Sequence, residues 1–430
     1  MHVVLRILAA ALLLFSFPTP SLARSQEATL KALVDSYAKH RGFNGTVLVA
    51  RGGRVLVRAA YGMADDVGRH EPSNADLHYR IGSLTKPFTA TLVMQLVGQG
   101  RLRLDGTLAD YLPDLYGGTA AAPVTIEQLL SHTSGIADVP RRYDDPWWRT
   151  SARQQWTPTD FARQWIKPEI VETPGTKWRY NNNGFFLLGL IVERVTGRTY
   201  ADNLQERIFG PAGMSASGLF SRSTDKRSFA TGYAVTPEGT PKAPDAIDPS
   251  VSFSAAGIYS TVDDILRFDR ALYATRLIDA DGRATMLRAH TKFYGFGWEV
   301  EEYTLPGGKM LPVVSHTGSV PGYQSYYLRS EPQQDCVIIL DNFWQGALVS
   351  QMGRDLMEVL NGKPMQLAQY SLDNLLTPIA YTQGVDAMVD AYARLGKQQA
   401  KYDLSERAFN ALGYKFLRDN HTGEAIQVFR

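Results

Sequence analysis

Ser83 and Lys86 stand three residues apart in the stretch "IGSLTKPFTATLVMQL", where an apolar helical pattern begins. A serine hydroxyl is a poor nucleophile near neutral pH and needs a neighbouring base. Residues three apart on a helix share one face, so the lysine can reach the hydroxyl. Pro87 is tolerated only near the start of a helix. The stretch therefore predicts a nucleophilic serine in the first helical turn, where free N–H groups favour developing negative charge.

The spacing alone is common, because "SYAK" (Ser36, Lys39) and "STDK" (Ser223, Lys226) share it. Taken by itself, Ser83 could be a helix-capping serine beside an exposed lysine. Two further stretches of the sequence favour catalysis over this alternative.

The first is "WRYNNNGFFLLG", which places Tyr180 and Asn182 just before an apolar helix. A tyrosine whose pKa is lowered by a lysine ammonium can share the serine proton and later deliver it to a leaving group. The Asn182 amide can hold the lysine and a substrate carbonyl together. Read without context, the stretch is a turn followed by an Asn cap.

The second is "VVSHTGSVPGYQSYYL", where strand alternation is interrupted by His316, Thr317, Gly318 and Ser319. We expect Gly318 to let a substrate lie close against the strand edge. The Ser319 N–H, paired with that of Ser83, would then form an oxyanion hole. A plain hairpin with "SVPGY" as its turn explains the proline and glycine but leaves the histidine unexplained.

Together the three stretches resemble the serine β-lactamase-like family, which includes class C β-lactamases, D-alanyl-D-alanine carboxypeptidases and β-lactamase-fold esterases. The family's S-x-x-K motif matches residues 83–86, its Y-x-N motif matches residues 180–182, and His316 occupies the lysine position of its K-T-G motif. The stretches "LLSHTSGI", "AAGIYSTVDDILRF" and "YGFGW" are also similar to the family. The resemblance covers residues 26–362.

The resemblance implies an α+β fold, in which an antiparallel sheet flanked by helices lies beside a mostly helical subdomain. It places the active site in the cleft between them, with Ser83 as the acylated nucleophile and Lys86 and Tyr180 as the base pair. We expect the substrate to be oriented by Asn182, His316, Thr317, Gly318 and Ser319. The substrate would be a small molecule or a peptide, and no metal or organic cofactor is expected.

His316 departs from the family's lysine. Its unperturbed pKa near ~6.5 leaves it mostly neutral at pH 7, so we expect it to hold a substrate carboxylate weakly. This favours an esterase or peptidase over the alternatives of a D-Ala-D-Ala carboxypeptidase or a β-lactamase. A non-catalytic scaffold that binds cell-wall fragments is a further alternative. Because no G-x-S-x-G motif occurs, we expect His132 to brace a loop rather than to complete a Ser-His triad.

The remaining sequence predicts the elements that must position these residues. Residues 46–50 and 55–60 read as a β-hairpin around Gly52-Gly53. Strand character returns only at "FYGFGWEV", "LPVVSHTG", "YQSYYLRS" and "CVIILDN", with helical patterns between. One antiparallel sheet built from the early hairpin and the later strands would bury the apolar faces of both. The helical part between them in sequence would then lie beside the sheet.

The first residues have the layout of a secretory signal, with Arg6, an apolar run over residues 7–17 and small residues before Ala23. We expect cleavage after residue 23 and a periplasmic or secreted protein, because the run is too short to span a bilayer. The formal net charge of +2 over 430 residues gives no nucleic-acid footprint. Cys336 is the only cysteine, which excludes an internal disulfide and a cysteine zinc site, and its apolar surroundings predict a buried thiol.

We expect three regions: the signal (residues 1–23), the hydrolase domain (residues 24–365) and a helical C-terminal segment (residues 366–430). That last segment resembles a partial tetratricopeptide repeat through Phe409, Leu412, Gly413, Phe416, Ala425 and Phe429. One repeat cannot bury its own apolar face. The segment would therefore pack on the main domain or bind a protein partner; a simple helical appendage is the alternative.

Overall fold

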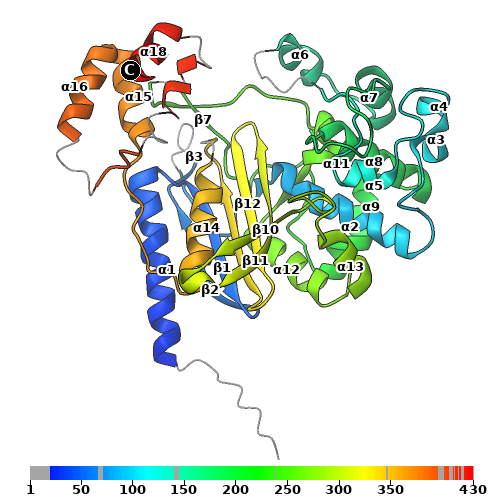
Figure 1. Cartoon of the computed structure of the whole chain (residues 1–430), viewed down its shortest axis with the longest axis horizontal. Helices are drawn as coiled ribbons and strands as arrows, with labels where there is room; N and C mark the ends of the chain where they lie inside the picture. The colour runs from blue at the N-terminus through cyan, green and yellow to red at the C-terminus, as the bar shows by residue number, and fades with distance from the viewer. Residues whose placement is uncertain are drawn as a thin grey trace, which may run out of the picture.

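The computed structural model describes residues 20–65, 71–139, 145–236, 238–344, 347–395, 401–405, 410, 412–414, 416–417 and 421–429. A twisted sheet forms the centre, a helical part lies on one side of it, and the C-terminal helices lie on the other side (Figure 1). The fold is thus the expected α+β arrangement.

The main sheet has six antiparallel strands in the order β10-β11-β12-β13-β1-β2. The strands are β1 (Gly45–Arg51), β2 (Arg54–Tyr61), β10 (Glu299–Thr304), β11 (Met310–Val320), β12 (Tyr323–Ser330) and β13 (Asp335–Asp341). Gly45 pairs with Asp341 and with Tyr61, so the early hairpin joins the late strands. The prediction of one sheet built from both ends of the region is confirmed.

The stretch "FYGFGWEV" was expected to have strand character, and that prediction is wrong for the first six of its eight residues. Strand β10 begins only at Glu299. Gly297 adopts a φ of 75°, which breaks an extended strand, while Tyr294 and Trp298 are buried. Tyr294, Phe296 and Trp298 therefore lie in a buried loop that leads into the strand, whereas Phe293 at its start is exposed.

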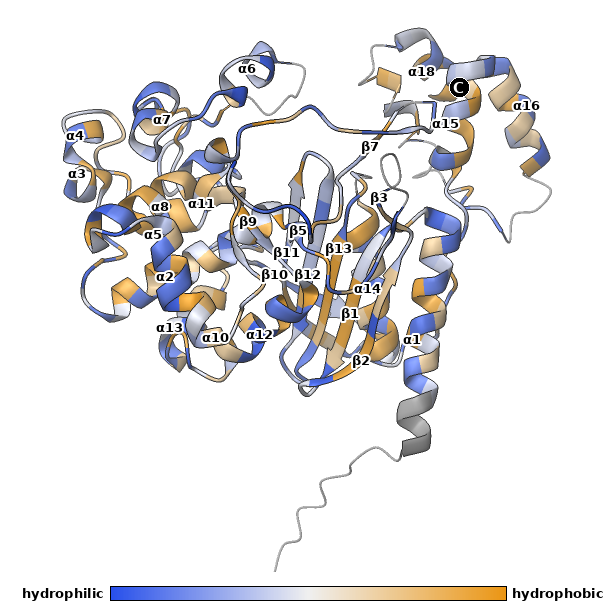
Figure 2. Ribbon diagram, turned by 180° about the vertical axis from the view of Figure 1, so that it is seen from behind, coloured by the Kyte–Doolittle hydropathy of each residue, from blue (hydrophilic) through white to orange (hydrophobic). Residues whose placement is uncertain are grey.

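Helices cover both faces of the sheet. On one face α1 (Pro20–Arg41) packs against α14 (Leu348–Leu360), and their apolar side chains share a core with the strands. On the other face α12 (Val262–Tyr273) contacts β1 and β13. Thr261 caps α12 by accepting a hydrogen bond from the Asp264 N–H. Cys336 on β13 is buried, as predicted, and burial raises its thiol pKa well above the ordinary value. Figure 2 shows the apolar strands enclosed between these layers.

The helical part is inserted between β2 and β10. Its helical elements are η1 (Gly82–Leu84), α2 (Thr85–Gly98), α3 (Leu108–Tyr111), α4 (Pro113–Tyr116), α5 (Ile126–Leu130), α6 (Pro146–Arg149), η2 (Ser151–Arg153), α7 (Pro158–Trp165), α8 (Asn182–Thr196), α9 (Tyr200–Leu204), η3 (Gln205–Phe209), α10 (Gly210–Ala212), η4 (Pro249–Val251), α11 (Phe253–Ala256) and α13 (Ala280–Leu287). Three small sheets accompany them: β3 (Met63–Asp65) with β4 (Glu71–Pro72), β5 (Tyr79–Arg80) with β9 (Ile258–Ser260) and β6 (Gly218–Leu219), and β7 (Ala234–Val235) with β8 (Pro241–Lys242). Two apolar helices, α2 and α8, pack together at its centre.

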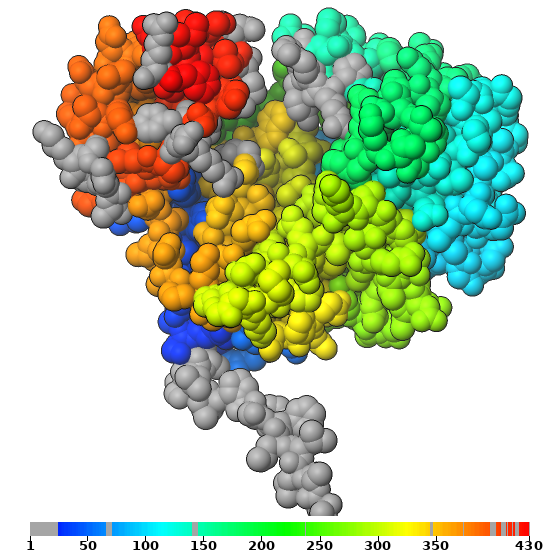
Figure 3. Space-filling model, in the orientation of Figure 1, coloured from blue at the N-terminus to red at the C-terminus, as the bar shows by residue number. Residues whose placement is uncertain are grey.

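The C-terminal helices are α15 (Leu372–Gln383), α16 (Val385–Leu395) and α18 (Thr422–Phe429). They enclose a small apolar cluster of their own, which includes Leu412, Phe416 and Ala425. In Figure 3 they form the orange and red block beside the sheet. Polar contacts join them to α1, where Arg41 pairs with Asp403 at 3.1 Å. Phe409 lies outside the described residues, so the tetratricopeptide resemblance stays a prediction, as do the three region boundaries.

The expected signal segment falls almost wholly on residues 1–19, which lie outside the described part of the chain. Among the helices that are described, none combines the length and the apolar character needed to cross a bilayer. Export therefore stays a prediction from the sequence.

Candidate active site

Ser83 lies in η1, a short 3-10 turn that leads directly into α2. Gly82 starts this turn with a φ of 54°, and the Leu84 N–H donates to the Ile81 carbonyl at 3.2 Å. Pro87 is the third residue of α2, where the missing N–H is tolerated. The prediction that the serine stands in the first helical turn is confirmed.

Lys86 is fully buried beneath the serine. Its Nζ donates to Ser83 Oγ at 3.1 Å, to Asn182 Oδ1 at 2.9 Å and to the Ala255 carbonyl at 3.0 Å. It also lies 4.6 Å from the centre of the Tyr180 ring. Burial of an ammonium group is unfavourable unless its donors are satisfied, and these three oxygens together with the aromatic face compensate for it. The lysine is thereby fixed within hydrogen-bond distance of the serine hydroxyl.

Tyr180 completes a three-residue cluster, because its Oη lies 2.7 Å from Ser83 Oγ. It stands just before α8, whose N-cap is Asn181: the Asn181 side chain accepts from the Gly184 N–H at 2.7 Å. The helix-cap interpretation of "YNNN" is confirmed, and the catalytic interpretation stays a prediction. Asn181 is the helix cap, and Asn182, the next residue, reaches Lys86.

The serine turn presses against β11 through two glycines. A Cβ atom on Gly82 would lie 2.6 Å from the Ser319 nitrogen, and one on Gly318 would lie 1.9 Å from the Ile81 carbonyl oxygen. We expected Gly318 to make room for a substrate; instead it makes room for the protein's own backbone just before Ser83. The two glycines bring the Ser319 amide next to the serine turn.

The edge of β11 beside Ser83 is left open by its neighbour. Strand β10 pairs with β11 only as far as Ser315, opposite Glu299. Beyond that point Thr317 is half-buried and Ser319 is exposed. The Trp344 indole N–H donates to Ser319 Oγ at 2.7 Å and so orients this end of the strand. An extended substrate segment could lie along this short edge.

His316 does not face the edge. Its side chain is 1% exposed, Nδ1–H donates to the Thr317 carbonyl at 2.5 Å, and Nε2 lies 3.1 Å from Tyr294 Oη. Burial, followed by the nearby Lys86 charge, lowers the pKa of His316 to about 3. The ring is therefore neutral, as expected, but both nitrogens are used inside the protein. A direct contact between this ring and the substrate, which we expected, is not what the geometry provides.

His132 and Tyr294 link the cluster to His316. The Asn181 N–H donates to His132 Nδ1 at 3.1 Å, which leaves the ring proton on Nε2, 3.1 Å from Tyr294 Oη. Burial raises the pKa of Tyr294 well above its usual value, so its single proton points to His316 Nε2. The expectation that His132 braces a loop is confirmed, and the loop is the one that carries Tyr180.

Sequence reasoning missed the specific contributions of Ala255 and Tyr294. Each lies in a stretch that resembles the family, "AAGIYS" and "YGFGW" respectively, but a backbone carbonyl has no signature in a motif. Neither residue could be paired with Lys86 or His316 before the fold was known.

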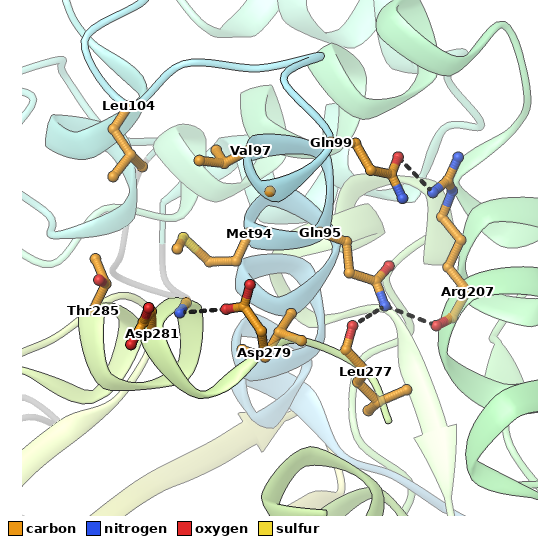
Figure 4. Close-up of a pocket in the computed structure, with 13 residues that line it drawn as sticks. Met94, Gln95, Val97, Gln99, Leu104, Arg207, Leu277, Asp279, Asp281 and Thr285 are labelled. Atoms are coloured by element: carbon orange, nitrogen blue, oxygen red, sulfur yellow. Dashed lines mark hydrogen bonds between the residues drawn. The ribbon is translucent and has the colours of Figure 1, made fainter. Parts of the chain in front are cut away.

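A separate hollow of about 530 Å³ lies at the other end of α2 (Figure 4). Its lining includes Gln95, Gln99, Arg207, Asp279 and Asp281. None of the predicted site residues lines it. Across the described ranges, no group of three or more His, Cys, Asp or Glu side chains is arranged to hold a metal ion.

Comparisons with known proteins show which family the chain is similar to. The family profile described as Beta-lactamase matches residues 30–356. Putative penicillin-binding protein PbpX of Bacillus subtilis (strain 168) is 28% identical over 350 residues, which cover 79% of this chain and 82% of that protein. The D-aminopeptidase of Brucella canis is 29% identical over 332 residues, which cover 73% of this chain but only 59% of the relative.

Solved structures share the fold. The crystal structure of a penicillin binding protein from Bacillus halodurans superimposes with a TM-score of 0.65 at 26% identity, covering 77% of this chain and 99% of that one. The profile match spans most of the chain, and the similar proteins include penicillin-binding proteins and a D-aminopeptidase. The chain therefore belongs to the β-lactamase family and is a serine hydrolase.

Proposed function

We propose that Ser83 is acylated during cleavage of an ester or amide bond whose substrate carries no carboxylate beside the scissile carbonyl. The observation that carries this proposal is the position of Ser83 Oγ, 2.7 Å from Tyr180 Oη and 3.1 Å from Lys86 Nζ. An alcohol held between a phenol and an amine has its base already in place.

In the acylation step Ser83 Oγ attacks the carbonyl carbon, and its proton passes to the Lys86–Tyr180 pair. The N–H groups of Ser83 and Ser319 stabilise the oxyanion. This assignment is supported by Gly82 and Gly318, which let the serine turn lie close against β11. Asn182 fixes Lys86 and orients the substrate carbonyl. Tyr180 then delivers the proton to the leaving alcohol or amine as the bond to it breaks.

In the second step water attacks the acyl-enzyme, with Tyr180 as the base that accepts its proton. The Ser83 oxygen leaves and regains a proton from the same pair. Thr317 and the backbone of residues 316–319 orient the acyl group along the open strand edge. His316 acts on this edge indirectly, through its hydrogen bonds to Tyr294 and to the Thr317 carbonyl.

The charge of the cleft supports a substrate without a carboxylate near the reacting bond. Lys86 is buried and directed at internal oxygens, and His316 is neutral with both ring nitrogens engaged. Neither group is placed to pair with a carboxylate in the cleft. The name of the D-aminopeptidase relative supports including amides of D-amino acids among the candidates.

Labelling the serine tests the acyl-enzyme. We expect intact-mass measurement to find one adduct per chain after exposure to a fluorophosphonate, and none in Ser83→Ala. Ser223→Ala, which alters the decoy serine of "STDK", is the matched control and should label fully. A wild-type chain that takes up no adduct would support the non-catalytic binder instead.

A substrate panel tests which type of bond is cleaved and whether a carboxylate on the substrate is disfavoured. We compare nitrocefin, a short-chain p-nitrophenyl ester and a D-amino-acid amide, each against Ser83→Ala. Turnover of the ester or amide with a higher kcat/KM than that of nitrocefin is expected. A preference for nitrocefin would identify a β-lactamase and refute the substrate proposal.

Export and a protein partner are separate proposals. Arg6, the apolar run and the small residues before Ala23 support cleavage of a signal and a periplasmic or secreted location. Mass measurement of the protein from cell fractions should find a chain that starts at residue 24. Exposed Tyr414, Leu417 and Ile426 on the C-terminal helices support a protein partner, which should co-purify with the natural chain and be lost from Ile426→Glu.

A further inference from the structure

Two aromatic side chains near Tyr180, Trp178 and Phe293, are more exposed than their size and apolar character would favour. Trp178 is 36% exposed and Phe293 is 38% exposed. Their ring centres lie 4.7 Å apart in an edge-to-face arrangement. A single exposed apolar residue needs no explanation, but two that contact each other beside a reactive serine form a small apolar surface. We call them the aromatic pair.

The aromatic pair is continuous with the reactive cluster. Trp178 lies two residues before Tyr180, and the two ring centres are 6.5 Å apart. Phe293 comes from the separate loop that leads into β10. The buried rings of His132 and Tyr294 lie behind Trp178, with centres 6.2 Å and 5.9 Å away.

The rings behind the aromatic pair hold it in position before a substrate binds. His132 and Tyr294 are held by hydrogen bonds at 3.1 Å to Asn181 and His316, so the rings that back the pair are fixed before a substrate arrives. A binding surface that is ordered in advance loses little conformational entropy when it is occupied. Both rings of the pair keep more than a third of their surface exposed.

The position of the pair indicates which part of the substrate it contacts. In the proposed reaction Tyr180 delivers a proton to the leaving group, so the leaving group must lie on the Tyr180 side of Ser83. The oxyanion lies on the other side, towards Ser319. The aromatic pair adjoins Tyr180, so the leaving group is the part of the substrate within its reach.

We infer that the aromatic pair is a subsite for an aromatic or flat apolar group on the leaving alcohol or amine. This inference rests on the proposed function. Contact with two rings stabilises such a group beyond what the burial of its apolar area alone provides. The enzyme would therefore act on benzyl-type esters, or on amides of aromatic amines and aromatic amino acids, in preference to small alkyl ones.

Benzyl and methyl esters of one acid test the subsite. The two esters give the same acyl-enzyme, so a difference in kcat/KM reports the leaving group alone. Benzyl alcohol and methanol are also of similar basicity, which keeps the chemical step comparable. We measure one pair of acetates and one pair of D-alanine esters.

For the wild-type chain we expect a benzyl-to-methyl ratio of kcat/KM above about ten. Trp178→Ala should lower this ratio roughly tenfold through the benzyl ester, with methyl ester turnover within about twofold of wild type. Phe293→Ala should act in the same direction, and Trp178→Phe should keep most of the ratio. The control is Tyr414→Ala, which removes half of an exposed edge-to-face pair with Phe429 on the C-terminal helices and should change nothing.

The outcomes distinguish failure of the aromatic subsite from failure of the proposed function. A ratio that Trp178→Ala and Phe293→Ala leave unchanged overturns the subsite while the hydrolase stands. An equal loss on both esters also overturns it, because it would mean that the ring only supports Tyr180. If the wild type cleaves none of the four esters and Ser83 takes up no fluorophosphonate, the proposed function fails, and the subsite fails with it.

Discussion

Tyr180 and Lys86 both contact Ser83 Oγ, and their surroundings divide the work between them. Lys86 is enclosed by Asn182, Ala255 and aromatic rings, so its position is fixed by the interior. Tyr180 is only partly buried. In the proposed mechanism, the proton that leaves with the alcohol or amine therefore passes through the tyrosine.

This division predicts the effect of Tyr180→Phe. The variant keeps the ring that packs on His132 but loses the hydroxyl that exchanges the proton. We expect kcat for an ester to fall by about 10²–10⁴, the usual contribution of a general acid or base, with KM changed little. Steady-state kinetics check this, with circular dichroism to show that the fold is kept. A kcat within threefold of wild type would remove Tyr180 from the mechanism.

The buried His316 predicts a pH dependence of stability. Its pKa is about 3 in the folded chain against an ordinary value of 6.5. As the pH falls below 6.5 the unfolded chain binds a proton that the folded chain excludes until about 3, so the free energy of unfolding decreases across this window. For one proton the slope approaches 1.4 kcal/mol per pH unit.

Replacing the ring tests this assignment. His316→Gln removes the titrating group, so its stability should decline less steeply with acidification, by on the order of 2 kcal/mol between pH 6.5 and about pH 4.5. Urea unfolding at these two pH values measures the difference. The control is His421→Gln, at a histidine whose side chain is 43% exposed. Parallel declines for wild type and His316→Gln would contradict the lowered pKa.

At the scale of elements, the contact between η1 and β11 sets the geometry of the proposed oxyanion hole. The turn and the strand come from opposite ends of the catalytic region and meet at Gly82 and Gly318. Ser325 Oγ on β12 also donates to the Ile81 carbonyl at 2.7 Å, which holds the turn from a second strand. The distance between the Ser83 and Ser319 amides depends on this contact.

Gly82→Ala should therefore impair both activity and stability. The added Cβ would lie 2.6 Å from the Ser319 nitrogen, on a backbone with a φ of 54°. We expect destabilisation of about 1–3 kcal/mol and a loss of kcat/KM of at least roughly tenfold, because the oxyanion donors separate. Ester kinetics and thermal unfolding measure the two effects.

Gly98→Ala is the matched control for this prediction. Gly98 ends α2 and has nothing within 4 Å of an added Cβ. The substitution should stabilise the helix by about 0.5–1 kcal/mol and leave kcat/KM unchanged. Equal behaviour of the two glycine variants would show that the close approach at Gly82 is unimportant.

The elements that could be predicted from the sequence are those whose patterns are local. The hairpin at the start, α8 with its stop at Gly197, and Ser83 at a helix start each follow from periodicity or from one special residue. The role of Gly318 could not be predicted. Its requirement for a missing side chain comes from Ile81, which is distant in sequence.

The burial of His316 escaped prediction for a similar reason. A histidine in a strand can face either side of the sheet, and only the approach of Tyr294 and Lys86 from other segments decides which. The motif supplied the residue types of the site. The direction of each side chain was set by contacts between segments.

For the whole molecule, the C-terminal helices have a core separate from that of the catalytic part. They are joined to α1 by the Arg41–Asp403 pair and by the Asn374 side chain, which donates to the Arg41 carbonyl at 3.0 Å. The candidate active-site residues all precede residue 320, and the family match ends at residue 356. Catalysis should therefore be independent of these helices.

A chain that ends at Lys363 tests this independence. We expect kcat/KM for an ester to stay within about threefold of the full chain, because none of the contacts to Ser83, Lys86 or Tyr180 is lost. The melting temperature should fall by roughly 2–4 °C as the end of α1 loses its partners. Arg41→Ala in the full chain should reproduce part of this fall. A truncated chain that is folded but inactive would place the helices in the catalytic unit.

The pairing of β1 with β13 has a consequence for how activity first arises. A nascent chain exposes Ser83 early, but the strand that carries Ser319 and the strand that pairs with β1 are synthesised much later. Such long-range pairing is slow to form, because the chain loses conformational entropy in bringing distant segments together before their contacts stabilise it. The polypeptide is consequently inactive while it emerges from the ribosome. Hydrolase activity begins only after β1 has paired with β13.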